Sequence, residues 1–154
     1  MKNELVNEFE EKFSLMKKEL GFKASLDELD GIFFIKDFVL EKKFVSEKLS
    51  RMVCGRILDL YGSWINYLHG LIMPNPNYLP GVTESQMFDD KDEIMKMLEK
   101  IMALVSMNTL VGLTKDRKME SKFIDDSVKL WKELNPKLIK ILEKVNKNWV
   151  EKSK

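Results

Sequence analysis

The sequence predicts an all-α protein: a single domain over residues 1–154, built as a bundle of five or six helices around one long central helix, at about 46–73. Apolar residues recur at three- and four-residue steps in most stretches, which is the spacing of a helix with one buried face. Only the run Ile32–Ile35 has a strand-like composition, and no second such run could pair with it. We therefore expect helices throughout.

Two helices are predicted before the central one. Residues 2–20 carry one apolar stripe, and Gly21 is placed to end the helix. A second helix is expected from Ser25 to about Lys43, because Ser25 followed by Glu28 is a capping-box pattern.

The central helix is predicted from the pattern of its apolar residues, which cover one half of a helical cylinder. Ser46 is a suitable N-cap, and Glu47 follows where the helix dipole favours an acid. The other half holds small and polar residues, and Gly55 and Gly62 on that side predict the close approach of another helix.

The second half of the chain is predicted to hold one irregular connection and three helices. Residues 74–81 contain three prolines and a glycine, which disfavour both a helix and a central strand. A fourth helix is expected to begin near Thr83 or Asp90 and to end at Gly112. A fifth and a sixth helix, to about Val150, are expected to be separated at Asn135–Pro136.

The composition excludes several classes of protein. A single cysteine cannot form an internal disulfide, and a net charge of +1 argues against strong non-specific attraction to nucleic acid or acidic lipid. The most apolar window, Leu60–Met73, is shorter than the roughly 20 residues that span a bilayer. Acidic residues stand near the N-terminus where a signal peptide has its apolar core. We expect a cytoplasmic protein with no membrane partner.

Catalytic signals are weak in this sequence. Cys54 and His69 are the only thiol and imidazole, and about 22 Å separates them along a continuous helix, at a rise of 1.5 Å per residue. The common glycine-rich nucleotide motifs, the esterase motif and the zinc-protease motif are missing. We expect no cofactor and no catalytic residues, and favour a protein that is not an enzyme.

An acidic cluster is the sharpest motif. Carboxylates three residues apart on a helix can hold Mg²⁺, and the weak candidates here are Asp89, Asp90, Asp92 and Glu93. Such a site needs further carboxylates from a facing helix, and acids at a helix start are common for capping alone. No metal site is therefore expected, and a Mg²⁺-dependent phosphohydrolase is the last of the alternatives.

The polar side of the central helix offers a further candidate site, formed by Arg56, Asp59, Ser63, Asn66 and His69. A hydrogen-bond network buried between helices is the favoured interpretation, because such networks specify one packing arrangement. A polar floor to a ligand pocket is the alternative.

The C-terminal helix carries a lysine stripe that consists of Lys137, Lys140, Lys144 and Lys147. From Lys115 to Lys154 there are twelve basic residues and seven acidic ones. This stripe makes a nucleic-acid-associated protein the main alternative function.

The leading hypothesis is a non-enzymatic protein–protein interaction module that self-associates as a homo-oligomer. Three Trp, nine Phe and ten Met occur in a chain without a convincing catalytic constellation. The contact surface is expected on an apolar or Met-rich helix face, or on the connection Pro74–Gly81.

Overall fold

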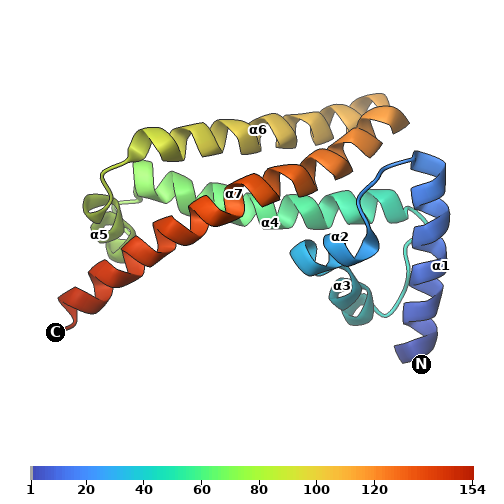
Figure 1. Cartoon of the computed structure of the whole chain (residues 1–154), viewed down its shortest axis with the longest axis horizontal. Coiled ribbons are helices and arrows are strands. Elements are labelled where there is room, and N and C mark those ends of the chain that lie inside the picture. The colour runs from blue at the N-terminus through green and yellow to red at the C-terminus, as the bar shows by residue number, and fades with distance from the viewer. Residues whose placement is uncertain (1) are drawn as a thin grey trace. The chain divides into compact units, whose positions relative to one another are not determined.

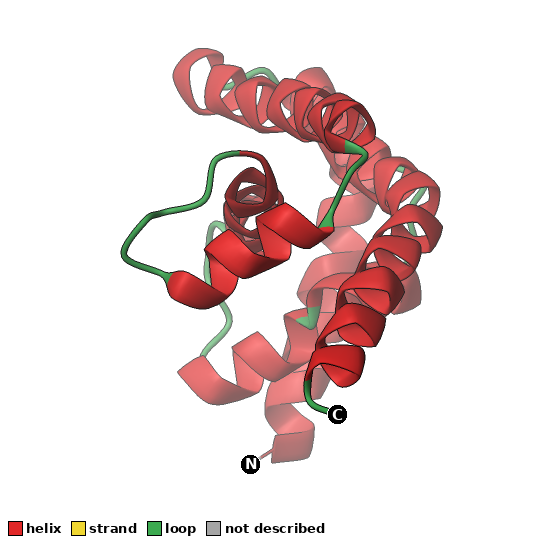
Figure 2. Ribbon diagram, turned by 90° about the vertical axis from the view of Figure 1, so that its left-hand side faces the viewer, coloured by secondary structure: helices red, strands yellow, loops and turns green. Residues whose placement is uncertain are grey.

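The computed structural model describes residues 2–154, which form seven helices and no strand (Figure 1). The view coloured by secondary structure shows only helices joined by loops (Figure 2). The predicted all-α fold class is confirmed.

The described residues group into two compact units. Unit 1 comprises the chain up to Leu60 together with Leu104–Lys129, and unit 2 comprises Tyr61–Ala103 together with Leu130–Lys154. Three long helices contribute residues to both units, namely α4 (Leu49–Ile72), α6 (Lys91–Thr114) and α7 (Arg117–Lys152). That all of the chain folds as a single domain stays a prediction.

Helix α1 (Lys2–Leu20) begins unit 1 and ends where the sequence predicts. Gly21 has a φ of +81°, a conformation that glycine adopts at little cost, and its N–H bonds to the carbonyl of Lys17 at 2.7 Å. The buried face of α1 includes Phe9 and Phe13, whose rings lie 5.9 Å apart.

The second predicted helix is two helices in the structure, α2 (Leu26–Phe33) and α3 (Ile35–Lys42). The capping box is confirmed, since Glu28 N–H bonds to Ser25 Oγ at 3.1 Å and Ser25 N–H bonds to Glu28 Oε1 at 3.2 Å. Phe34 breaks the helix with a left-handed φ of 55°. The break buries both Phe33 and Ile35, which would point in nearly opposite directions in one helix.

The central helix α4 is confirmed as a long helix, but it begins at Leu49, three residues after the predicted N-cap. Ser46 Oγ accepts the N–H of Lys48 at 3.1 Å, so Ser46 stabilises the turn before the helix. The predicted close approach at Gly55 and Gly62 is wrong. A Cβ added at either position would meet nothing within 4 Å.

Unit 2 corrects the prediction for residues 74–81. Helix α5 (Leu79–Met87) begins inside this stretch, with Pro80 in its first turn. Proline is tolerated there because the N–H groups of the first turn lack a partner within the helix.

The two C-terminal long helices also differ from the prediction. Asp90 caps α6 by accepting the N–H of Glu93 at 3.2 Å, but Gly112 does not end this helix, which continues to Thr114. The predicted fifth and sixth helices form one helix, α7, with Pro136 inside it. Proline removes one hydrogen bond there, and the good helix formers on both sides continue the helix.

The core differs in character between the units. Unit 1 buries the phenylalanines of α1, α2 and α7 together with aliphatic residues of α4. In unit 2 the ring of Trp131 lies 6.3 Å from Tyr61 and 6.4 Å from Trp64.

Candidate functional site

The polar side of α4 lies largely in solvent. Asp59, Ser63, Asn66 and His69 are exposed, so they do not form the buried network that is the favoured expectation. Arg56 is half-buried, pairs with Asp59 at 3.4 Å and lies 4.9 Å from the Phe38 ring. The two pockets described below are lined by other residues.

The acidic cluster has a structural role at the start of α6. Asp90 is the cap, and the side chain of Asp89 is 90% exposed, with Lys144 at 4.0 Å. Within residues 2–154, no three His, Cys, Asp or Glu side chains are grouped so that they could hold a metal ion. Within this range, no other helix brings to the acidic cluster the facing carboxylates that a Mg²⁺ site requires.

The lysine stripe lies along α7. Lys140, Lys144 and Lys147 are exposed, and Lys137 is half-buried. The amino group of Lys144 lies 5.0 Å from the centre of the Phe88 ring, which also belongs to unit 2, so this lysine packs over an aromatic ring rather than extending freely. Nucleic-acid binding by this stripe stays a prediction.

The thiol of Cys54 is fully buried. Burial raises its pKa to about 12, and the negative charge of Glu120 adds to this shift. A thiol with such a pKa is protonated at neutral pH and is a poor nucleophile. His69, the only imidazole of the chain, is exposed and lies fifteen residues after Cys54 on the same helix. It is therefore too far along α4 to act as a base for this thiol.

A buried carboxylate is the most distinctive polar feature of unit 1. Glu120 of α7 is 2% exposed and accepts a 2.8 Å hydrogen bond from Arg51 of α4. The second terminal nitrogen of Arg51 donates to Asn108 of α6 at 2.9 Å. One arginine therefore connects three long helices through two side chains that are themselves buried.

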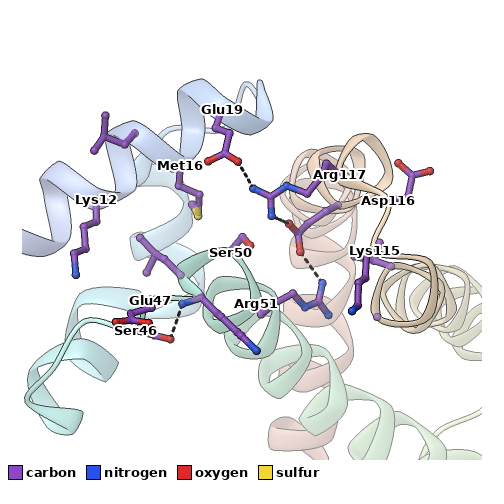
Figure 3. A pocket seen from close by; sticks show the side chains of 16 residues that line it. Lys12, Met16, Glu19, Ser46, Glu47, Ser50, Arg51, Lys115, Asp116 and Arg117 are labelled. Atoms are coloured by element: carbon purple, nitrogen blue, oxygen red, sulfur yellow. Dashed lines mark hydrogen bonds and ion pairs between the residues drawn. The ribbon is translucent and has the colours of Figure 1, made fainter.

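A second arginine extends this arrangement. Arg117 lies 3.5 Å from Glu120 and donates to Glu19 of α1 at 2.8 Å; Figure 3 draws these bonds as dashed lines. We call Arg51, Asn108, Glu120, Arg117 and Glu19 the Arg51–Glu120 cluster. Its charges alternate in sign, which keeps the buried carboxylate compensated.

The cluster borders a pocket of about 760 Å³ in unit 1, the α4 pocket, at the start of α4 (Figure 3). Its basic lining residues are Lys12, Lys48, Arg51, Lys115 and Arg117, and its acidic ones are Glu19, Glu47, Asp116 and Glu120. Leu15, Met16, Leu49 and Val111 give it an apolar wall. This combination suits a ligand with a charged end and an apolar body.

A smaller pocket of about 370 Å³ shares three residues with the α4 pocket, namely Ser46, Lys48 and Arg51. Phe38, Phe44 and Met52 form its apolar part, and Lys42 adds a third cation. No acidic side chain lines it. The smaller pocket, which Lys48 lines, therefore has a more positive lining than the α4 pocket, where acidic residues are nearly as many as basic ones.

Sequence reasoning did not select Glu120 or Asn108. Both stand on apolar stripes, Glu120 one turn before Phe123 and Ile124, and Asn108 between Leu104 and Val111. A charged or amide side chain in the register of a buried stripe is the signal that would have found them.

The exposed face of α6 is unusually poor in charge. No charged residue occurs from Ile101 to Thr114, and in this run Leu110 is 49% exposed and Leu113 is 78% exposed. Among residues 2–154, α6 is the one helix long and apolar enough to cross a membrane, by length and composition only. About a third of its most apolar window is buried in the structure.

Comparisons with models of protein families, with curated proteins and with solved structures gave no significant match.

Proposed function

We propose that this chain is a non-enzymatic interaction module that associates with a second copy of itself through α6. The contact is the α6 patch, which we define as Ser106, Thr109, Leu110 and Leu113. The observation that carries the proposal is the exposure of Leu110 and Leu113 on a helix segment without charge. Large apolar side chains exposed together are typical of interaction sites.

The spacing of the α6 patch gives it one continuous face. Its residues are three, one and three positions apart, so they lie on the same side of the helix. All four are exposed and all belong to unit 1. A partner helix would therefore meet a narrow stripe of two leucines bordered by two hydroxyl groups.

A second copy is the occupant that this chemistry favours. In a two-fold symmetric interface the same surface faces itself, and any charged group tends to meet a like charge. The α6 patch has no charge to oppose, and the chain's net charge of +1 adds little repulsion between copies. The α6 patch offers no charged side chain with which a strongly charged partner could form an ion pair.

The size of the patch limits the expected affinity. A stable interface buries about 800 Å² on each partner, which is more than two leucines and two hydroxyl side chains provide. Neighbouring residues must contribute, and we expect a dimer in the micromolar range rather than a permanent one.

A cytoplasmic location without a membrane partner goes with this proposal. Six charged residues stand in the first ten positions of α6, so a span through this helix would carry charged side chains into the bilayer, which is costly. Binding of membrane vesicles by the chain would oppose this part of the proposal.

The test is the oligomeric state of matched variants, measured by size-exclusion chromatography with light scattering. We expect the wild type to show a mass that rises with concentration, and Leu110→Lys and Leu113→Lys to remain monomeric. Val150→Lys is the control, because Val150 is an exposed apolar residue on α7 with 49% exposure. A wild type that is monomeric at every concentration would refute the proposal.

The nucleic-acid alternative has its own test. The lysine stripe predicts binding to short RNA or DNA that weakens steeply with added salt. Binding that is lost in Lys140→Gln together with Lys147→Gln, while the oligomeric state stays unchanged, would favour this alternative.

A further inference from the structure

The first turn of α4 carries backbone hydrogen-bond donors that no acceptor within residues 2–154 uses. The first N–H groups of any α-helix lack a partner within the helix. Here Met52 is the first residue whose N–H bonds back, to the carbonyl of Lys48 at 3.1 Å. Ser46 accepts from Lys48 and not from the first turn, and that turn holds no acidic residue.

Ser50 adds a buried hydroxyl at the same place. The residue is 6% exposed and lines the α4 pocket. Its hydroxyl oxygen is not among the fully buried atoms without a partner and bonds to no other side chain or backbone group within residues 2–154, so it opens into the pocket. Figure 3 shows Ser50 at the start of α4, facing the space that Met16 and Arg117 border. A hydroxyl group that opens into a pocket and has no protein partner can bond to water or to a ligand.

The acidic side chains of the α4 pocket are mostly engaged. Glu19 and Glu120 pair with arginines, and Asp116 accepts the N–H groups of Lys118 and Met119 at 3.0 and 3.2 Å. The start of α7 is therefore satisfied by its own chain, in contrast to the start of α4. Glu47 is the lining acid without such a bond in the described part of the chain.

Two lysines of the α4 pocket have no ion pair within residues 2–154, namely Lys48 and Lys115. Lys12, by contrast, pairs with Glu8 at 3.0 Å. Lys48 also lines the smaller pocket, where Lys42 and Arg51 add positive charge and no acid opposes it. The positive charge that remains available is therefore concentrated beside the unused donors of α4.

We propose that the α4 pocket binds a phosphate monoester with an apolar organic part. The phosphate group lies at the first turn of α4, where it accepts from the Ser50 hydroxyl and the first N–H groups and is paired with Lys48 and Lys115. Helix N-termini favour such anions through their dipole and free N–H groups. The organic part lies against Leu15 and Val111, and a pocket of 760 Å³ suits a small molecule.

The test is isothermal titration calorimetry of the full chain at low ionic strength, with three probes. Phenyl phosphate is expected to bind more tightly than inorganic phosphate, and phenol, which lacks the anion, is expected not to bind. Amide NMR shifts on adding phenyl phosphate are expected to be largest at residues 49–51. This proposal does not depend on the α6 patch.

Variants distinguish a specific site from general attraction to lysines. Lys48→Met and Ser50→Ala are each expected to weaken phenyl phosphate binding about tenfold or more, since each removes a charge-assisted or buried hydrogen bond. Lys48 is exposed, so its variant tests the site even if Ser50→Ala folds poorly. Lys96→Met, which removes an exposed lysine of α6, is the control and is expected to bind like the wild type.

Two results would overturn the proposal. One is the absence of phenyl phosphate binding by the wild type. The other is an equal loss of affinity in Lys48→Met and Lys96→Met, because that would show attraction to the net charge and not to the α4 pocket.

Discussion

Arg51 donates a 2.8 Å hydrogen bond to Glu120, whose side chain is only 3% exposed. A buried carboxylate costs several kcal/mol unless a cation and further donors compensate it. Arg117 lies farther from the same carboxylate, at 3.5 Å. The stability of Glu120 in the core of unit 1 therefore depends chiefly on Arg51.

We predict that Arg51→Met lowers the free energy of unfolding by about 3 kcal/mol, because it leaves a buried charge poorly paired. The measurement is urea unfolding followed by circular dichroism. The double variant Arg51→Met with Glu120→Leu removes both charges and is expected to recover most of the loss. If the two single effects simply add in the double variant, the pairing does not exist in solution.

Asp125 joins α7 to the segment between α1 and α2. Its carboxylate accepts the N–H of Lys23 at 2.9 Å and the N–H of Ala24 at 2.8 Å. We predict that Asp125→Ala lowers the free energy of unfolding by about 2 kcal/mol, since two backbone donors lose a charged acceptor. The neighbouring Asp126 pairs with Lys122 on the surface, and Asp126→Ala is expected to cost about 0.5 kcal/mol or less. Equal losses would contradict this role of Asp125.

Glycine within α4 is predicted to be a site of stabilisation. A Cβ at Gly62 would meet nothing within 4 Å, so Gly62→Ala should raise the free energy of unfolding by about 0.5–1 kcal/mol through its higher helix propensity. Gly21→Ala is the opposite case, because its φ of +81° strains any other residue. Thermal unfolding of both variants checks the prediction, and a destabilised Gly62→Ala would reveal a contact at that face of α4.

The buried thiol of Cys54 predicts a loss of stability at alkaline pH. Its pKa is about 12 in the folded chain, against an ordinary value of 9.0. Between these pH values the thiol of the unfolded chain ionises while the thiol of the folded chain keeps its proton. Ionisation lowers the free energy of the unfolded state, so the free energy of unfolding falls as pH rises. The slope approaches about 1.4 kcal/mol per pH unit and vanishes below pH 9.

The measurement for Cys54 is the unfolding free energy at pH 8 and pH 10, for the wild type and for Cys54→Ala. The difference between the two proteins in this pH dependence cancels the contributions of the other titrating groups. The wild type is expected to lose more stability than the variant over this interval. A parallel fall in both proteins would mean that Cys54 is not the group responsible.

Local sequence signals predicted the helix ends that depend on a few neighbouring residues. The Ser25–Glu28 capping box and the glycine stop at Gly21 are local, and both are confirmed. The break at Phe34 depends on which residues the core of unit 1 accepts, and no local pattern contains that information. The same holds for Pro136, where the flanking helix-forming residues outweigh the cost of one proline.

The candidate sites were harder to predict for the same reason. The residues on the polar side of α4 share one helix face, but sequence periodicity does not show which face another helix covers. The α4 pocket draws on α1, α4, α6 and α7, so its residues come together only through tertiary packing. Only Glu120 and Asn108 carry a sequence signal, as polar residues within apolar stripes.

Sedimentation velocity of the wild-type chain measures self-association through α6 without a matrix or a label. We expect a sedimentation coefficient that rises with concentration from that of a monomer toward that of a dimer, and a constant monomer value for Leu113→Lys. A wild type that sediments as a monomer up to concentrations well above the micromolar range would contradict it.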